Sequence, residues 1–459
     1  LAQAALKAVG AASRPRVGGR AKLDEASSHF KAVIVRHPLS RHAAKARKGL
    51  EELAAMVPKG KSASTLTGKE LYRQARVFYR KQRNRRAERG FAAAIARGLD
   101  LKGRCRARYY QAKSIFKQRQ RDRAEPHFAA AAKLCQRAKL RELVVKSLYN
   151  QARGLYRKGK FVAAARLFLS LERRFPKHSY GDDARLRAAE AYAEQKKKKK
   201  VRQILAKLPA LHPRGDQRRE ALWRLAWQAY LDKRWKRALA HLQRIIDTLG
   251  TARKYYAEGR ALYWKARILA RLRKPKAAVK SYEAAIRTYP LSYYALLGFN
   301  RLRERWPRRY RKLRDELLRP IGKKAGRWRF EDHGRSTKEG FRRGVELLRL
   351  GFGDHAAREL ARAGLSTRRG PKRELWLAAV LFDRAGQWVF SHQVPRSRDW
   401  RWKRAYPLAD NVRRWRIAYP KAFPRLVLPL SKRAAVPREL TWAVMREESG
   451  FSTRIESYA

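Results

Sequence analysis

Residues 148–168 read Leu-Tyr-Asn-Gln-Ala-Arg-Gly-Leu-Tyr-Arg-Lys-Gly-Lys-Phe-Val-Ala-Ala-Ala-Arg-Leu-Phe, and this stretch decides the fold. Leu148, Ala152 and Leu155 recur at helical spacing, and Ala164 with Phe168 begins a second helical stripe after the Lys158-Gly159 turn signal. The stretch therefore predicts two helices joined by a short turn, which is a helical hairpin.

The second helix of this hairpin carries a small residue followed four positions later by a large apolar one, and this pair recurs along the chain. From Ala87 onward, successive pairs are 37, 40, 37, 37 and 40 residues apart. The gap from Ala26 to Ala87 is 61 residues, so the first unit is irregular or is followed by an insertion. The pairs are Ala26/Phe30, Ala87/Phe91, Ala124/Phe128, Ala164/Phe168, Val201/Leu205, Ala238/Leu242 and Ala278/Tyr282.

Prolines mark the ends of several second helices. Pro38, Pro176, Pro213 and Pro290 each follow the small residue of a pair by twelve positions. A hairpin of this kind has a core only when neighbouring hairpins stack on it. The pattern predicts an all-α protein whose residues 1–300 form a superhelix of helical hairpins similar to tetratricopeptide repeats, with a period slightly longer than usual.

Beyond residue 300 the repeat stops. Pro307, Pro320, Gly322, Gly326 and Gly334 indicate a connector over residues 301–336. Helical patterns resume after it, with Ser336 and Glu339 as an expected capping box, and predict a helical linker domain over residues 337–405. Residues 406–459 form a last segment with a different character.

That segment ends in a helix that carries two adjacent acids, Glu447 and Glu448. Pro437 suits the first helical position, Leu440, Ala443 and Val444 form an apolar stripe, and Gly450 suits the C-terminal cap. An acid in the last helical turn faces the negative end of the helix dipole, and partial burial beside Val444 and Met445 would favour its neutral form further. Such a carboxyl group can act as a general acid. The two acids have equal claims on these grounds.

The order of residues from Tyr406 to Ala459 resembles the start of the catalytic domain of the soluble lytic murein transglycosylases, which are goose-lysozyme-like enzymes. The similarity rests on Arg446-Glu-Glu-Ser-Gly-Phe451, and also on Tyr406-Pro-Leu-Ala409, Tyr419-Pro420, Ala435-Val-Pro437 and Leu440 to Val444. In that family the catalytic acid precedes Ser in a Glu-Ser-x-Phe motif. The resemblance selects Glu448 as the catalytic residue, Ser449 and Phe451 as motif residues, and Ser457 as the approach to a further motif segment. It also identifies Ile286 to Leu297 as the junction after a helical superhelix.

The resemblance implies cleavage of the β-1,4 bond between N-acetylmuramic acid and N-acetylglucosamine in peptidoglycan, leaving 1,6-anhydromuramic ends. One Glu would act first as acid and then as base, with no metal or cofactor, and Glu456 is interpreted as a solvated surface residue. The implied location is the periplasm or cell envelope. We expect residues 1–459 to lack the rest of the catalytic domain and to be inactive alone.

Charge keeps two other functions open. The chain has 114 Lys and Arg against 38 Asp and Glu, a formal net charge of +76. The turns inside the hairpins are basic and are expected to form a ridge facing an anionic polymer. Non-specific nucleic-acid binding and a non-catalytic scaffold that holds protein partners are therefore the alternatives. The basic turns are Lys81 to Arg86, Lys117 to Arg123, Arg157 to Lys160, Lys196 to Lys200, Asp232 to Lys236 and Arg271 to Lys276.

The two cysteines and ten histidines carry less information. Cys105 begins the first helix of a hairpin and Cys135 ends the second, so antiparallel packing could bring them together as a disulfide. The histidines show no metal-ligand spacing. No run of eighteen apolar residues exists, so a transmembrane helix is not expected.

Overall fold

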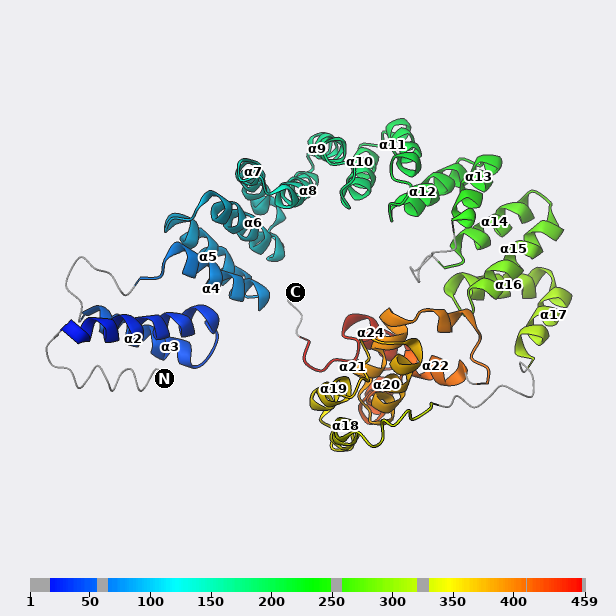
Figure 1. Ribbon diagram of the computed structural model, residues 1–459. Helices are drawn as coiled ribbons and strands as arrows, with labels where there is room; N and C mark the ends of the chain where they lie inside the picture. Colours follow the sequence, from blue (N-terminus) through cyan, green and yellow to red (C-terminus); the bar gives the residue numbers. More distant parts are fainter. Residues whose placement is uncertain (1–16, 56–64, 249–257, 320–329, 410, 456–459) are drawn as a thin grey trace. The chain divides into compact units, whose positions relative to one another are not determined.

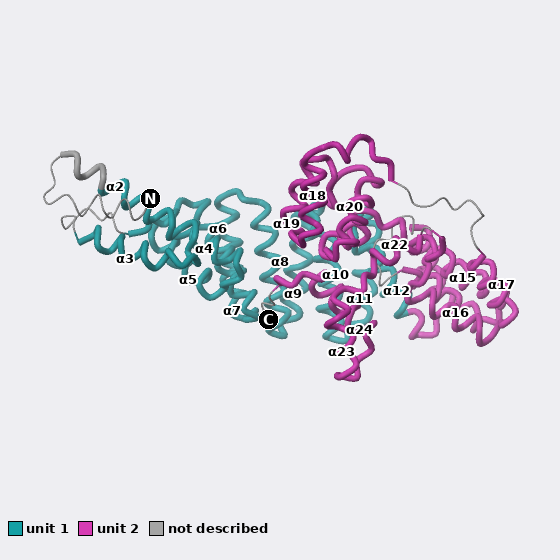
Figure 2. The backbone as a smooth tube through the Cα atoms, turned by 90° about the horizontal axis from the view of Figure 1, so that it is seen from below, with its two compact units in different colours: residues 1–228 teal, residues 229–459 magenta. Residues whose placement is uncertain are grey.

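The computed structural model describes residues 17–55, 65–248, 258–319, 330–409 and 411–455, and for residues 17–22 the backbone only. All regular elements within these ranges are helices, so the all-α prediction is confirmed. The chain divides into two compact units, residues 1–228 and residues 229–459, which are coloured separately in Figure 2. Of the helices in the described ranges, none is long and apolar enough to cross a lipid bilayer.

The first unit is a series of helical hairpins (Figure 1). Turns inside and between the hairpins are only a few residues long, which favours antiparallel neighbours. In chain order the helices are α2 (Val17–Arg36), α3 (His42–Ala55), α4 (Gly68–Arg80), α5 (Asn84–Ala96), α6 (Leu101–Lys117), α7 (Arg121–Arg137), α8 (Arg141–Arg157), α9 (Phe161–Arg174), α10 (Gly181–Glu194), α11 (Lys198–Leu211) and α12 (Arg218–Leu231). From α4 to α11 each helix packs against the next, and α4 also packs against α2.

The repeated small–large pairs form the core, as predicted. Every member of the seven pairs is at most 5% exposed, from Ala26 and Phe30 to Ala278 and Tyr282. The small residue lets two helices approach closely, and the large side chain fills the space against the next hairpin. The four prolines also lie where predicted, because Pro38, Pro176, Pro213 and Pro290 each come two residues after the last residue of α2, α9, α11 and α15 (Pro275–Thr288).

Each basic turn inside a hairpin contains one residue in the left-handed region of backbone space. These residues are spaced like the repeats themselves, and all but one have a side chain, at a conformational cost of about 1–2 kcal/mol each. They are Gln82 (φ 58°), Arg119 (φ 64°), Gly159 (φ 72°), Lys196 (φ 57°), Lys233 (φ 56°) and Arg273 (φ 54°).

Gly159 is the member of this series that can be tested most simply. A Cβ at Gly159 would meet no atom within 4 Å, so a Gly159→Ala change alters backbone strain and nothing else. We expect it to lower the free energy of unfolding of the first unit by about 1 kcal/mol, measured by urea denaturation. The Lys160→Ala variant, one residue later in the same turn, is the control, because Lys160 is exposed and has φ −79°. An unchanged stability of Gly159→Ala would contradict the strain.

A disulfide joins Cys105 in α6 to Cys135 in α7, with their Cα atoms 4.9 Å apart. Both residues are fully buried. The bond closes a loop with a sequence separation of 30 residues inside the hydrophobic core of the first unit.

The second unit contains two groups of helices. The first group continues the hairpins with α13 (Trp235–Asp247), α14 (Arg260–Arg271), α15, α16 (Tyr293–Arg305) and α17 (Pro307–Leu318), so helix α17 lies inside the range expected as a connector. The second group comprises α18 (Glu339–Arg349), α19 (Gly353–Arg362), α20 (Lys372–Arg384), α21 (Trp388–Ser391), a π-helix at Val394–Arg398, a 3-10 helix at Arg401–Arg404, α22 (Asn411–Ala418), α23 (Pro424–Arg433) and α24 (Arg438–Glu448).

The expected capping box at the start of α18 is wrong. The residue that precedes α18 is Lys338, which makes no side-chain capping bond. The Ser336 backbone N–H donates to the Asp332 carboxylate at 2.9 Å, and the Ser336 hydroxyl donates to the same carboxylate at 2.5 Å. A nearby acid therefore holds Ser336 in a turn, three residues before the first residue of the helix.

Two polar contacts tie the second group to the first. Lys403 pairs with Glu258, a carboxylate that is 4% exposed and whose pKa is raised by burial against the opposing effect of Lys403. The Tyr406 hydroxyl donates to the Ile286 carbonyl at 3.2 Å. These contacts fix residues 403–406, just before the segment that carries the candidate site.

Candidate active site

Helix α24 carries the candidate acid at its last residue. Pro437 lies at the N-cap position, one residue earlier than expected, and Gly450, with φ 55°, follows the C-cap residue Ser449. The glycine cap is therefore where the sequence predicts it. The apolar stripe is not buried, because Leu440 is 54% and Val444 is 52% exposed.

The Ser449 side chain organises the turn that follows the helix. Its hydroxyl donates to the Met445 carbonyl at 2.9 Å and accepts the Phe451 backbone N–H at 3.1 Å. Phe451 is 2% exposed and has φ 65°, a conformation that a bulky residue adopts only when its surroundings impose it. Ser449 and Phe451 therefore hold the turn at the end of α24 in one shape.

The two adjacent acids have different surroundings. Glu447 forms ion pairs with Arg446 and with Arg396, the latter at 3.7 Å. Glu448 is exposed and makes no ion pair or side-chain hydrogen bond with the residues that the structure describes. Because Glu448 is exposed, the expected partial burial beside Val444 and Met445 is wrong within the described part of the chain. Leu440 and Val444, in the apolar stripe beside it, are exposed as well.

Two residues of the predicted linker domain contact the turn, and neither was predicted to belong to the site. Arg396, in the π-helix, donates to the Arg446 carbonyl at 2.5 Å and so satisfies one of the last carbonyl groups of α24. His392 is 2% exposed, and its ring contacts the Phe451 ring edge-to-face at 5.4 Å between centroids. A π-helix is common near functional sites, but residues 394–398 show no pattern from which it could be predicted.

Burial, reinforced by the nearby Arg446 and Arg396, lowers the pKa of His392 to about 3. In the unfolded chain the pKa of this histidine is about 6.5, so between pH 7 and pH 5 the unfolded state takes up a proton that the folded state does not. Acidification over this range should therefore destabilise the packing around His392 by up to about 2 kcal/mol. We expect the hydrogen-exchange protection of residues 445–455, corrected for intrinsic rates, to fall more than about tenfold over that pH range.

His392→Leu should abolish the pH dependence of this protection, because no proton can then be taken up. His355→Leu is the matched control, since His355 is exposed in the same unit. The same pH dependence in His392→Leu and in the unaltered chain would show that another group is responsible.

Two hollows lie beside the turn. One is a groove of about 570 Å³ between α23 and α24, lined mainly by apolar side chains including Leu426, Leu430 and Met445, and we call it the α23–α24 groove. The other is a cleft of about 840 Å³ bounded by α19, α21 and the Ser452–Arg454 loop, and we call it the linker cleft. Phe423, Phe451, Ser452 and Thr453 line both hollows.

Side-chain hydrogen bonds hold α24 against α23 and against the residues that precede α23. The Ser431 and Thr441 hydroxyls share a hydrogen bond of 3.0 Å between α23 and α24, and the Trp442 indole donates to the Ala422 carbonyl at 2.8 Å. Arg446 donates to the Ala418 carbonyl at 3.0 Å and lies 4.6 Å from the centre of the Tyr419 ring.

Ser457 and Glu456 lie outside the described residues.

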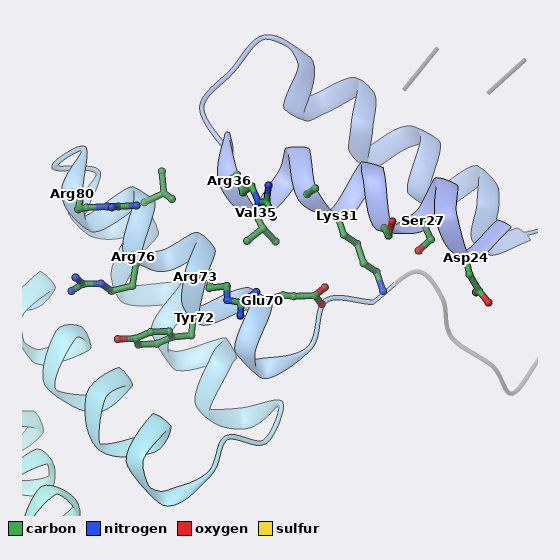
Figure 3. A pocket seen from close by; sticks show the side chains of 13 residues that line it. Asp24, Ser27, Lys31, Val35, Arg36, Glu70, Tyr72, Arg73, Arg76 and Arg80 are labelled. Atoms are coloured by element: carbon green, nitrogen blue, oxygen red, sulfur yellow. The ribbon is translucent and has the colours of Figure 1, made fainter. Parts of the chain in front are cut away.

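A third hollow, in the first unit, is basic. It has a volume of about 630 Å³ and lies between α2 and α4, whose side chains are labelled in Figure 3. Glu70, one of its two acids, accepts hydrogen bonds from the Thr67 N–H at 2.8 Å and hydroxyl at 2.9 Å. The lining cations outnumber the acids, and they are Lys31, Arg36, Arg73, Arg76 and Arg80.

One acidic cluster has the composition of a metal site. Carboxylate oxygens of Asp182, Asp183 and Asp216 lie within 4.8 Å of one another. Asp182 and Asp183 accept the Gln217 backbone and side-chain N–H groups at 3.0 and 2.9 Å. Burial and the neighbouring carboxylates raise the pKa of Asp183. These hydrogen bonds connect α10 to the start of α12, which gives the cluster a structural role.

The tetratricopeptide repeat family model matches residues 183–214, 220–248 and 260–292. No curated protein matches the chain. Solved structures are similar at low identity: the C-terminal part of a tetratricopeptide repeat protein from Cytophaga hutchinsonii is 18% identical, with 59% of this chain and 98% of that chain covered and a TM-score of 0.41. An inactive mutant of the lytic transglycosylase Slt from Pseudomonas aeruginosa is also 18% identical, with 94% and 63% covered and a TM-score of 0.41. Both TM-scores lie below 0.5, so neither likeness extends to function.

Proposed function

We propose that this protein is a lytic transglycosylase that cleaves the bond between N-acetylmuramic acid and N-acetylglucosamine in peptidoglycan. The observation that carries the proposal is the turn Glu448-Ser449-Gly450-Phe451. Ser449 bonds to both sides of this turn and Phe451 is buried beneath it, while Glu448 projects from the last helical residue with no partner among the described residues. A general acid needs this combination of a fixed backbone and a carboxyl group that no cation occupies.

In the proposed reaction Glu448 donates its proton to the bridging oxygen as the bond to the muramic C1 atom breaks. The muramic C6 hydroxyl oxygen then attacks C1, and Glu448 takes the hydroxyl proton. The donated proton stays on the N-acetylglucosamine oxygen, and the proton from the C6 hydroxyl restores Glu448 to its acid form. No water is consumed, and the products are a 1,6-anhydromuramic end and a free N-acetylglucosamine end. The neighbouring Glu447 is less suited to this role, because it is already paired with Arg446 and Arg396.

The proposal requires that water be excluded from Glu448 when a glycan binds, because a general acid works in a site closed to solvent. The exposed apolar side chains beside it support a further covering layer. Leu426 is 62% exposed, and with Leu440 and Val444 it forms an apolar surface on α23 and α24 of a kind that proteins normally cover. Within the proposal, the remainder of a lysozyme-like domain covers this surface and completes the glycan groove.

The disulfide supports a location in the cell envelope. A bond such as Cys105–Cys135 forms and persists in oxidising compartments and is rare in the reducing cytosol. The proposed substrate lies in the same compartment. The location therefore agrees with the proposed reaction on independent chemical grounds.

A non-catalytic scaffold is the second candidate, and the basic hollow between α2 and α4 favours it. Its five cations and two acids suit a segment of acidic protein. The proposals differ in their products: incubating the full-length protein with purified peptidoglycan should release anhydromuropeptides, detected by mass spectrometry. Peptidoglycan that remains intact, together with salt-sensitive retention of an acidic peptide, would favour the scaffold.

A further inference from the structure

The linker cleft combines aromatic rings with charged and planar polar groups, whereas the polar residues that line the neighbouring α23–α24 groove are only Ser and Thr. Seven of the sixteen residues that line the cleft are polar: Asp354, His355, Arg358, Gln387, Ser452, Thr453 and Arg454. Its volume of about 840 Å³ lies within the range of ligand sites in proteins. The cleft therefore suits a ligand that has both apolar faces and many hydroxyl or amide groups.

The aromatic rings of the cleft are held in place and yet remain accessible. Phe352 is 54% exposed. Trp388 is half-buried and packs edge-to-face on Phe423 with 4.7 Å between ring centroids. A sugar ring presents a face of C–H groups, which carry partial positive charge and are attracted to the negative face of an aromatic ring.

Polar groups at the rim are also held in place. Gln387 donates to the Gly351 carbonyl at 3.2 Å, and a Cβ at Gly353 would lie 2.2 Å from its Oε1 atom, so a larger residue at position 353 would displace the Gln387 side chain. Arg358 lies 3.1 Å from the His355 ring nitrogen and forms no ion pair with a described carboxylate. Arg454 pairs with Asp354 at 2.8 Å across the mouth of the cleft.

From this arrangement we infer that the linker cleft is a binding site for N-acetylated sugars of the glycan strand, next to the proposed catalytic turn. The inference rests on the proposed function for the identity of the polymer. Phe451 belongs to the turn that carries Glu448, and it lines both the cleft and the α23–α24 groove together with Ser452 and Thr453, so a strand in the cleft would lie beside this turn. The cleft would thus hold sugars to one side of the bond that is cut.

The test is direct binding of chitohexaose, a neutral oligomer of N-acetylglucosamine, measured by calorimetry. A neutral probe in about 0.3 M salt avoids non-specific attraction to a chain of charge +76. The Glu448→Gln background prevents turnover. Within it, Phe352→Ala and, separately, Arg358→Ala should each weaken binding at least about fivefold.

Tyr293→Ala is the matched control, because Tyr293 is an aromatic residue in the same unit with 61% exposure, and binding should change less than about twofold. Binding that Phe352→Ala leaves unchanged would overturn the inference, as would a sugar-free stem peptide that competes with chitohexaose. If peptidoglycan stays uncleaved while both cleft variants weaken binding, the sugar site stands and the proposed activity fails. If cleavage needs Glu448 and neither cleft variant weakens binding, the proposed activity stands and the sugar site fails.

Discussion

Glu448→Gln in the full-length protein should lower the rate of anhydromuropeptide release at least about 100-fold, because a general acid and base of this kind contributes roughly 10²- to 10⁴-fold. Glutamine keeps the size and shape of the side chain and cannot give up a proton to the leaving oxygen. Glu448 is exposed and has no side-chain partner among the residues that the structure describes, so its replacement should leave stability within about 0.5 kcal/mol of the unaltered protein. Glycan binding should persist while cleavage is lost.

Glu447→Gln is the matched control one residue earlier. Its ion pairs with Arg446 and Arg396 are partly or largely exposed, so their loss should change the cleavage rate less than about fivefold. The reverse pattern, with activity lost in Glu447→Gln and retained in Glu448→Gln, would show that the catalytic acid is Glu447 and not Glu448. Equal loss in both variants, with reduced stability in both, would indicate damage to the turn rather than removal of a proton donor.

Replacing both cysteines by alanine, Cys105→Ala with Cys135→Ala, should lower the stability of the first unit by about 3–4 kcal/mol. This follows from the chain entropy of a closed loop with a sequence separation of 30 residues, and it would lower the melting midpoint of the unit by roughly 10 °C in a thermal scan followed by circular dichroism. Both sulfur atoms are buried, so the effect belongs to the core and not to a surface link.

A reducing agent distinguishes the bond from the packing of the residues. Reductant should shift the melting of the unaltered protein toward that of the double variant and leave the double variant unchanged. A double variant that melts with the unaltered protein would contradict a stabilising bond. Two titratable thiols in the denatured, unreduced protein would show that the bond does not form.

The hairpins could be predicted because their signal is local and repeated. Ala164 and Phe168 predict a buried stripe on one helix, and the same pair returns at each period, so stacking follows from the sequence without knowledge of distant contacts. The prolines confirm the helix ends for a local reason as well, since the ring cannot continue a helix. The capping box at Ser336 failed because Asp332 competes for the same hydroxyl and backbone N–H.

The candidate site was predicted only in part, because its support comes from far away in the sequence. Gly450 and Ser449 act within one turn of α24, where a motif suffices. His392 and Arg396 reach the same turn across some fifty residues, the latter through a bond to the Arg446 carbonyl, and no local pattern announces them. The stripe of Leu440 and Val444 has helical periodicity, but periodicity does not say what covers it.

Arg396 has a practical consequence for anyone who recombines this protein with a relative. A chimera that takes only residues 406–459 from this protein would contain α24 but not Arg396, whose guanidinium donates to the Arg446 carbonyl. It would also lack His392, whose ring packs against Phe451. A junction placed before His392, in the loop between α20 and α21, would transfer the candidate turn together with the two residues that contact it. The module that can be exchanged is therefore longer than residues 406–459, the segment that carries the sequence resemblance.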